Sequence, residues 1–261
     1  VYKPGATLDR TLEYGGKTVP IYRDRPLNVF SDVDFIWTGE ENENQRRLEY
    51  LGGEFRTRYG IDVSSFQGEI DWDAVADDNI DFAMVRVGFR GTGTGSLNTD
   101  KYYEQNIRGA MRAGLETGVY FFAQAVTVEE AIEEADYVIS LLDGLDINGP
   151  VAYDWEMHDS TYRVYGTSPE MATACAVAFC ERIKDAGYTP MVYGGTYVTY
   201  MKYDQGALAD YLSWYPEYKS EKSEKLCPTL VYHMDYWQFS SSRTVAGING
   251  RVDMNIQFIR R

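Results

Sequence analysis

Apolar strand-like runs alternate with amphipathic helical stretches from about residue 59 to the end of this chain. The candidate strands are Tyr59–Val63, Phe82–Phe89, Gly118–Ala125, Pro150–Glu156, Thr189–Gly194, Leu212–Tyr218, Val231–Phe239 and Arg251–Phe258. The candidate helices are Asp100–Thr117, Val128–Leu142 and Pro169–Ala186, the last of which follows the N-cap residue Ser168 and ends at Gly187. This alternation predicts an α/β fold, an irregular TIM-like (β/α) barrel with fewer helices than strands.

The first 56 residues have a different pattern. They contain short strand-like pieces such as Lys17–Tyr22, frequent turn residues and a polar, acidic run over Gly39–Asn44. We therefore predict a small N-terminal appendage or tether over residues 1–56 and a barrel over residues 57–261. The chain begins at Val1 without an initiator Met, which is typical of a processed or trimmed product.

Composition narrows the possible partners. The formal net charge of −15 argues against nucleic acid, because phosphate binding needs a basic surface. No apolar run is long enough to span a membrane.

The cysteines, Cys175, Cys180 and Cys227, lack metal-binding spacing, so we expect buried free thiols. The only histidines are His158 and His233, and no metal or other cofactor is expected.

The strongest candidate chemistry lies at the end of the strand Pro150–Glu156. Residues two apart in an extended chain face the same way, so Asp154 and Glu156 should stand side by side where the strand leaves the core. Two carboxylates at that range resist joint ionisation, so one of them tends to keep its proton near neutral pH. Such a pair can cleave a glycosidic bond. Two solvated surface acids are the alternative reading of this short pattern.

Further acids, Asp62 and Asp253, fall near the ends of two other strands. In α/β barrels chemistry occurs at the carboxyl ends of the strands, and an acid in an apolar strand is costly to bury without a partner. Aromatic residues gather at the same ends; they are Tyr120, Phe122, Tyr153, Tyr193, Trp214, Tyr218, Trp237 and Phe239, and Gln238 lies among them. Acids with aromatic walls are typical of a carbohydrate site. His158 follows the acid pair closely enough to touch such a site, although an ordinary loop residue is equally expected there.

A set of ordered motifs carries a family resemblance. They are Gly60–Gly68 with Ile70–Trp72, Phe82–Gly88, Gly118–Ala125, Val151–Glu156, Met191–Gly194, Trp237–Ser240 and Gly250–Asn255. In these motifs the chain resembles family 25 glycoside hydrolases, the bacterial and phage lysozymes (N-acetylmuramidases), including clostridial-type secreted or wall-associated members. The resemblance spans roughly residues 57–259. One segment departs from the family pattern Trp-Leu-Ala-x-Tyr, because Tyr215 and Pro216 stand between the matching Trp214 and Tyr218.

The resemblance implies an irregular barrel that hydrolyses the β-1,4 bond between N-acetylmuramic acid and N-acetylglucosamine in peptidoglycan. By position, Glu156 matches the general acid, Asp154 the carboxylate beside it, and Asp62 and Asp253 further acids at the groove floor. We expect Trp155 to help bury Glu156 and raise its pKa. Asp154 should stay ionised, either as nucleophile or by holding the 2-acetamido group of the substrate. Retention through the acetamido group is favoured.

Six residues are predicted to bind the glycan strand, with core packing as the alternative for the aromatic ones; they are Tyr120, Phe122, Tyr193, Trp214, Trp237 and Gln238. A structural capping role is the alternative for Asp62 and Asp253. The family resemblance further implies a monomer that is extracellular or associated with the cell wall.

Two other classes of function fit some of these residues. Asp62, Asp154, Glu156 and Asp253 could hold Mg²⁺ or Ca²⁺ in a barrel phosphodiesterase, although no histidine ligands or basic phosphate clamps accompany them. A domain that binds peptidoglycan without cutting it is the other alternative. The presence of both Asp154 and Glu156 speaks against it, because losing the acid is the simplest route to a binding-only protein.

Overall fold

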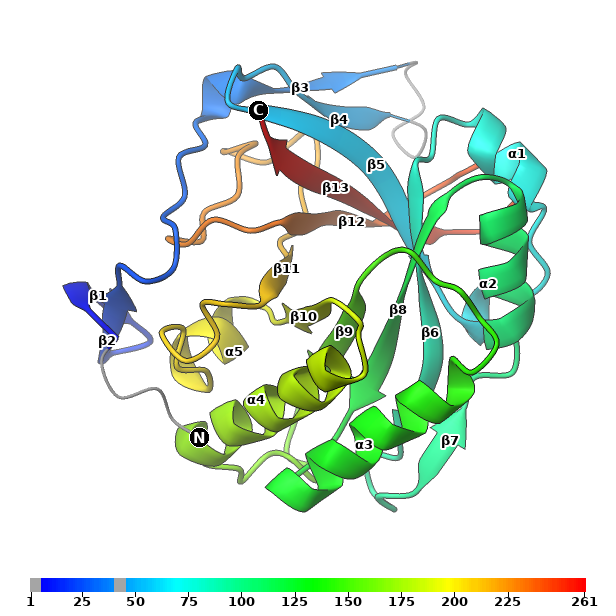
Figure 1. The fold of residues 1–261 in the computed structure, drawn as a ribbon. Coiled ribbons are helices and arrows are strands. Elements are labelled where there is room, and N and C mark those ends of the chain that lie inside the picture. The colour runs from blue at the N-terminus through cyan, green and yellow to red at the C-terminus, as the bar shows by residue number, and fades with distance from the viewer. Residues whose placement is uncertain (1–5, 40–45) are drawn as a thin grey trace.

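The computed structural model describes residues 6–39 and 46–261, and a closed barrel of strands lies at its centre (Figure 1). The strands of the main sheet are β5 (Phe55–Val63), β6 (Phe82–Arg90), β7 (Leu97–Thr99), β8 (Glu116–Ala123), β9 (Val151–Trp155), β10 (Pro190–Tyr193), β11 (Leu212–Pro216), β12 (Tyr236–Arg243) and β13 (Val252–Arg260). Their spatial order is β5-β13-β12-β11-β10-β9-β8-β6, and β7 pairs with the last residues of β6, Gly88–Arg90. Pairing of β5 with β6 closes the barrel.

The barrel is irregular because its last strand runs against its neighbours. Strands β5, β6 and β8 to β12 pair in parallel, whereas β13 is antiparallel to both β12 and β5. The start of β13 therefore reaches the end of the barrel at which the parallel strands finish. In the register of this pairing, Asp253 lies opposite Asp62. The predicted irregular α/β barrel is confirmed.

Five α-helices lie in the described residues, fewer than the strands; they are α1 (Trp72–Asp77), α2 (Tyr103–Arg112), α3 (Val128–Leu141), α4 (Pro169–Asp185) and α5 (Thr196–Met201). Helices α2, α3 and α4 cover the outside of the barrel (Figure 1). The predicted helix Asp100–Thr117 was too long at both ends. Asp100 accepts the backbone N–H of Tyr102 before the helix begins, and Gly114, with φ of +84°, follows its end.

Alternation along each strand separates two apolar cores. The barrel interior is filled by Phe82, Met84, Ala152, Met191, Tyr193, Trp214 and Tyr236. The side chains between these positions face outward and pack beneath the helices. In β9, for example, Tyr153 packs on Phe179 of α4 with ring centroids 4.8 Å apart, and the indole N–H of Trp155 donates to the carbonyl of Ala125. Asp154, which alternates with them, must therefore face the barrel interior.

The N-terminal segment forms two hairpins on the outside of the barrel, β1 (Leu8–Tyr14) with β2 (Lys17–Tyr22) and β3 (Phe35–Thr38) with β4 (Arg47–Tyr50). The second hairpin packs on β12, where Phe35 meets Trp237 edge-on with ring centroids 5.4 Å apart. The acidic run that begins at Gly39 lies outside the described residues from position 40 to 45.

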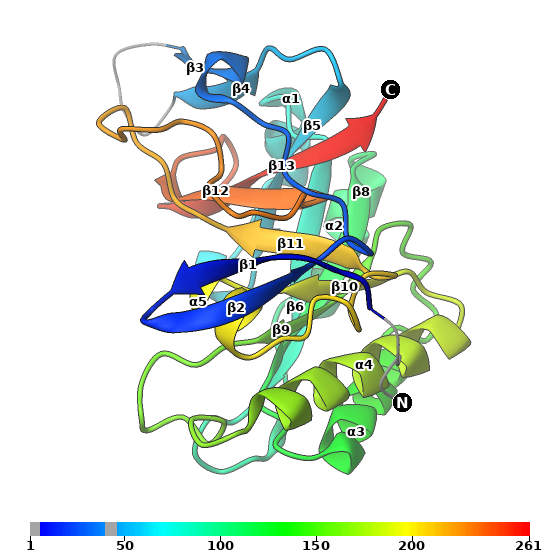
Figure 2. The ribbon, with the colours of Figure 1, turned by 90° about the vertical axis from the view of Figure 1, so that its left-hand side faces the viewer.

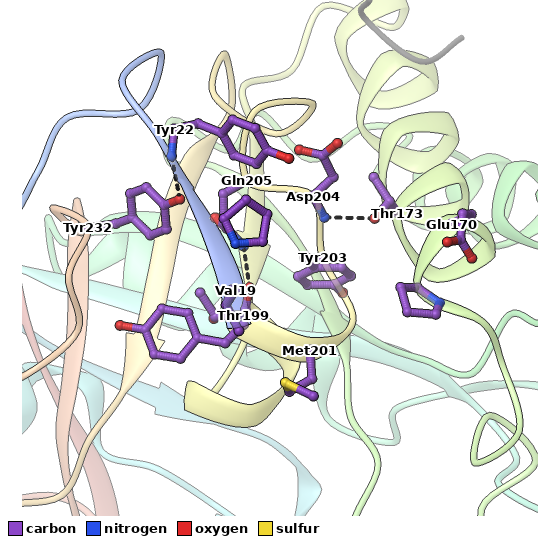
Figure 3. A pocket seen from close by; sticks show the side chains of 13 residues that line it. Val19, Tyr22, Glu170, Thr173, Thr199, Met201, Tyr203, Asp204, Gln205 and Tyr232 are labelled. Atoms are coloured by element: carbon purple, nitrogen blue, oxygen red, sulfur yellow. Dashed lines mark hydrogen bonds between the residues drawn. The ribbon is translucent and has the colours of Figure 1, made fainter. Parts of the chain in front are cut away.

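The first hairpin lies beside α5 (Figure 2). The ring of Tyr14 packs against that of Tyr200, with ring centroids 5.1 Å apart. The backbone N–H of Tyr22 donates to the hydroxyl of Tyr232 at 3.0 Å, which also holds the hairpin in place. A cavity of about 290 Å³ separates β2 from α4 and α5 (Figure 3). Its wall includes Tyr203 and Asp204.

Candidate active site

A cleft of about 340 Å³ opens at the end of the barrel where the parallel strands finish. All four predicted acids line it: Asp62 at the end of β5, Asp154 in β9, Glu156 one residue past β9, and Asp253 at the start of β13. The topology thus brings together acids that are up to 191 positions apart in sequence (253 − 62). They form two pairs within one cleft.

Asp154 and Glu156 form the first pair, and their carboxyl groups share a hydrogen bond. Asp154 is buried, and no amide or hydroxyl donor among the described residues reaches its Oδ1. Burial raises the pKa of Asp154 well above its usual range; the charges of Glu156 and Asp62 raise this pKa further, whereas Arg86 lowers it. These effects favour the protonated form of Asp154.

Glu156 is the member of this pair that reaches solvent, with 27% of its side chain exposed. Burial raises its pKa as well, but less, because the charge of His158 and the hydrogen bonds of Asp154 and His158 lower it. The Nε2 atom of His158 lies 3.1 Å from Oε2 of Glu156. Trp155 lies on the outer face of β9 and bonds to Ala125, so its side chain belongs to the outer core rather than to the barrel interior.

Asp62 and Asp253 form the second pair, and they too share a hydrogen bond. Burial raises the pKa of Asp62 to about 6, against hydrogen bonds from Asn255, Gln238 and Asp253 that lower it. Burial and then the charge of Asp62 raise the pKa of Asp253 to about 8. These raised pKa values favour one proton on the pair near neutral pH.

Amide side chains orient the second pair. Gln238 donates from Nε2 to Asp62 at 2.9 Å and to Asp253 at 3.3 Å, and its Oε1 accepts the hydroxyls of Tyr193 and Tyr218 at 3.1 Å each. Asn255 donates to Asp62 at 2.8 Å. Because a hydroxyl donor sits at Oε1 and acid oxygens at Nε2, only one orientation of the Gln238 amide satisfies every partner. The floor of the cleft is thus a fixed polar network.

The sequence is matched by the family model of glycosyl hydrolases family 25 over residues 61–248. The chain belongs to glycosyl hydrolase family 25. This match covers most of the barrel and three of the four acids. The fourth, Asp253, lies just beyond its end.

Individual relatives agree with this assignment. The autolytic lysozyme of Clostridium acetobutylicum is 26% identical over 197 residues, which cover 75% of this chain and 54% of that protein. Lysozyme M1 of Streptomyces globisporus is 27% identical over 201 residues, covering 75% of this chain and 66% of that protein. The chain therefore spans about half to two thirds of the length of these relatives.

Solved structures extend the likeness to the fold. The bacterial lysozyme of Streptomyces coelicolor superposes with a TM-score of 0.61 at 25% identity, over 76% of this chain and 90% of that one. The modular autolysin LytC of Streptococcus pneumoniae superposes with a TM-score of 0.65 at 24% identity, over 95% of this chain and 57% of that one. The second match covers so much of the chain that it has to include most of the N-terminal segment.

Five of the six predicted sugar-binding residues of this family 25 chain line the cleft, and one prediction was wrong. Tyr120, Phe122, Tyr193, Trp214 and Gln238 all border it. Trp237 does not, because it is fully buried on the outer face of β12, where its indole N–H donates to the carbonyl of Glu217. Since Gln238 faces inward, its neighbour in an extended strand has to face outward.

Several cleft residues were missed by the sequence reasoning; they are Ser64, Phe66, Gln67 and Arg86. Arg86 lies in β6 on the inward face shared with Met84, and its guanidinium pairs with Asp100 at 2.8 Å. A charged residue at an inward position of an otherwise apolar strand was the signal that could have revealed it. Phe66 is 84% exposed at the rim, beneath the Arg86 guanidinium.

A second cavity of about 510 Å³ adjoins the cleft, and the two share Glu156, His158 and Tyr193. Its wall carries two half-exposed aromatic rings, Tyr165 and Tyr197. The cleft and this cavity therefore form one groove that passes over the Glu156 carboxyl.

Other expectations about chemistry concern cysteines, metals and membranes. Cys175, Cys180 and Cys227 are buried free thiols, as predicted. Within residues 6–39 and 46–261, no group of three or more His, Cys, Asp or Glu side chains is arranged to hold a metal ion. The same residues contain no helix long and apolar enough to cross a membrane.

Proposed function

We propose that this chain hydrolyses peptidoglycan at the β-1,4 bond between N-acetylmuramic acid and N-acetylglucosamine. The observation that carries the proposal is the Asp154–Glu156 pair, one member buried and the other open to a groove that continues on both sides of it. Membership of family 25 and the lysozyme names of its relatives support it. LytC, which shares the fold, has been solved in complex with a synthetic peptidoglycan ligand.

In the proposed mechanism Glu156 delivers the proton to the leaving oxygen. A bound sugar covers the exposed part of Glu156 and so raises its pKa, whereas Asp154 is already buried and changes little. The shared proton therefore moves across the hydrogen bond from Asp154 to Glu156 when substrate binds. This transfer leaves Asp154 ionised, a state that the nearby Arg86 favours.

Ionised Asp154 then faces the positive charge that develops at the anomeric carbon. We propose that it orients the 2-acetamido group of the muramic acid, which attacks the anomeric carbon as the glycosidic oxygen leaves with the proton of Glu156. Water then opens the resulting ring, and the configuration is retained. Proton NMR of a fresh digest tests this step, because retention releases the β-anomer first and inversion the α-anomer.

Asp62 and Asp253 are proposed to bind sugar hydroxyls and to hold negative charge near the reacting centre. Their shared proton lets one oxygen donate while the others accept. We further propose that the protein acts as a monomer at the cell wall or outside the cell, and that residues 1–56 serve as an appendage that braces β12.

Release of soluble fragments from purified peptidoglycan tests the proposal. Glu156→Gln should lower the rate by roughly 10²–10⁴-fold, the usual contribution of a general acid. Glu104→Gln on the exposed surface of α2 is the matched control and should keep full activity. A chelator should have no effect, because no step uses a metal. Full activity of Glu156→Gln would overturn the acid assignment, and activity lost to the chelator would favour a metal-dependent phosphodiesterase.

A further inference from the structure

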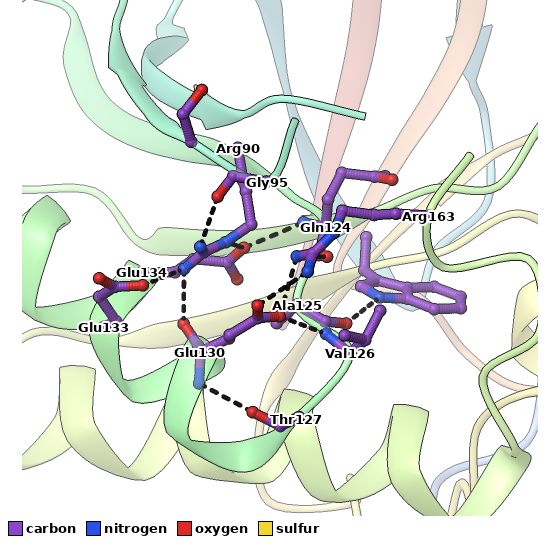
Figure 4. Close-up of polar contacts among 12 residues, drawn as sticks. Arg90, Gly95, Gln124, Ala125, Val126, Thr127, Glu130, Glu133, Glu134 and Arg163 are labelled. Carbon is purple, nitrogen blue, oxygen red and sulfur yellow. Dashed lines mark hydrogen bonds and ion pairs between the residues drawn. The ribbon is translucent and has the colours of Figure 1, made fainter. Parts of the chain in front are cut away.

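A buried hydrogen-bonded network surrounds Gln124 (Figure 4), and Gln124 in turn bonds to the main chain of Glu156. Glu156 lies one residue past β9, and the last pair in register between β8 and β9 is Ala123 with Trp155. Glu156 therefore lies just beyond the residues paired in the strand ladder. Gln124 lies one residue past β8, and its side-chain Nε2 donates to the carbonyl oxygen of Glu156 at 2.7 Å. Gln124 is fully buried.

Gln124 is itself held on both sides of its backbone. Its N–H donates to Oε1 of Glu134 at 3.0 Å, and its carbonyl accepts from Nη1 of Arg163 at 2.9 Å. Arg90 bonds to the same Glu134 oxygen at 2.8 Å. Each of these three contacts comes from a different part of the chain, so the position of Gln124 is fixed from β6, α3 and the loop after β9.

The Arg163 contact is braced in turn. Its guanidinium makes two parallel bonds to the carboxylate of Glu130, both at 2.8 Å, and Glu130 also accepts the backbone N–H of Val126. A bidentate arginine–carboxylate pair has a fixed geometry. Arg163 lies on the same loop as His158, so this pair also ties the loop that borders the groove to the start of α3.

Packing alone does not require a polar side chain at position 124. A carbonyl can only accept, so the amide nitrogen has to face Glu156. The Oε1 atom of Gln124 is left without a partner among the described residues, which costs free energy in a buried position. An apolar side chain of the same length would avoid this cost but would leave the carbonyl of Glu156 unheld.

We propose that Gln124 is a positioning residue for Glu156, and that the Arg90–Glu134 and Arg163–Glu130 pairs keep it in place. The inference rests on the proposed function, in which Glu156 passes a proton to an oxygen of the substrate. Proton transfer requires the donor within hydrogen-bond reach of the acceptor, and displacement by about 1 Å can cost roughly 10²-fold in rate. Gln124 and the two arginine–carboxylate pairs line neither the cleft nor the cavity that adjoins it.

The test is Gln124→Met, which keeps the length of the side chain and removes the donor. We expect kcat on peptidoglycan to fall by roughly 10–100-fold while KM stays within about twofold, because the groove is unchanged. The matched control is Gln205→Met. Gln205 is also buried and also donates from Nε2 to a backbone carbonyl, that of Thr199, but it lies away from the groove. It should lower the Tm without lowering kcat.

A second readout needs no turnover. The carboxyl carbon of Glu156 can be followed by NMR in protein labelled at glutamate, with Glu156→Gln to assign the signal. Gln124→Met should change the midpoint of its titration, whereas Gln205→Met should not. If Gln124→Met does not fold, Arg163→Lys, which breaks the bidentate pair at a partly exposed site, should lower kcat by roughly 3–10-fold.

The outcomes separate the two proposals. An inactive wild-type protein would overturn the proposed function, and the NMR titration would still decide the role of Gln124. An active wild-type protein with an unchanged kcat and an unchanged Glu156 titration in Gln124→Met would overturn the positioning role. Equal losses of kcat in Gln124→Met and Gln205→Met would also overturn it, because they would show a general loss of stability.

Discussion

His158 provides a sensitive test of how the acid pair is tuned. Its Nε2 lies 3.1 Å from the Glu156 carboxyl and favours the ionised form, so it lowers the pKa of Glu156. Replacing His158 by alanine should therefore raise that pKa. Activity requires one proton on the Asp154–Glu156 pair and is lost on the basic side when that proton leaves. The basic limb of the kcat/KM profile should then move to higher pH.

The expected shift of the basic limb follows from the exposure of the His158 side chain. The His158 side chain is 61% exposed, and exposed pairs of this kind contribute about 0.2–1 kcal/mol. At about 1.36 kcal/mol per pKa unit, the basic limb should move up by roughly 0.1–0.7 pH unit.

The assay is kcat/KM for release of soluble glycan fragments from pH 4 to 9 at constant ionic strength, with His158→Gln as the control. Glutamine keeps a hydrogen-bond donor but cannot carry the charge, so its shift should be smaller than that of alanine. A basic limb that stays in place in His158→Ala, or moves to lower pH, would refute this account of Glu156.

Three further predictions concern stability and specificity. Asp253→Asn should raise the Tm at pH 8 relative to wild type and leave it unchanged near pH 3. The pKa of Asp253 rises from 3.8 in the unfolded chain to about 8 in the folded protein. The cost of burying its charge therefore grows between these two pH values and is absent below them. Phe35→Ala removes a buried ring that packs on Trp237, and it should lower the free energy of unfolding by roughly 3 kcal/mol and the Tm measured by calorimetry by roughly 6–12 °C. An unchanged Tm would mean that the N-terminal hairpins do not brace the barrel. Trp214→Phe should raise KM for peptidoglycan fragments, because it breaks the hydrogen bond to Asn255 in the cleft floor. Trp237→Phe should leave KM within about twofold. Equal effects on KM would contradict the placement of Trp214 inside the barrel and of Trp237 outside it.

The alternation of strands with helices along the chain, together with the family motifs, was sufficient to predict the barrel. It was also sufficient to predict that four acids lie at one end of that barrel. The antiparallel course of β13 was not predictable from its composition, because apolar strands of either direction read alike. Asp253 nevertheless reaches the cleft, since the start of an antiparallel strand meets the ends of parallel ones. The segment Val231–Asp235 was predicted as strand, yet β12 begins only at Tyr236.

The period of two in an extended strand carries information about both faces of that strand. It placed Asp154 and Glu156 on one face, but the same rule applied to Gln238 would have sent Trp237 outward. Burial could not be read from the sequence, because it depends on which helices cover each strand. The raised pKa of Asp154 therefore became apparent only from its buried position without an amide donor. Gln124 and Arg86 were missed for the same reason, since their partners lie in distant segments.

Identification of the new reducing ends tests the central claim most directly. Purified peptidoglycan is digested with the wild-type protein, reduced with borohydride, hydrolysed and analysed by mass spectrometry for the two amino-sugar alcohols. We predict that muramicitol accumulates with time and that Glu156→Gln releases little of it. Accumulation of glucosaminitol instead, or no reduced ends from an intact and folded wild-type protein, would contradict the account.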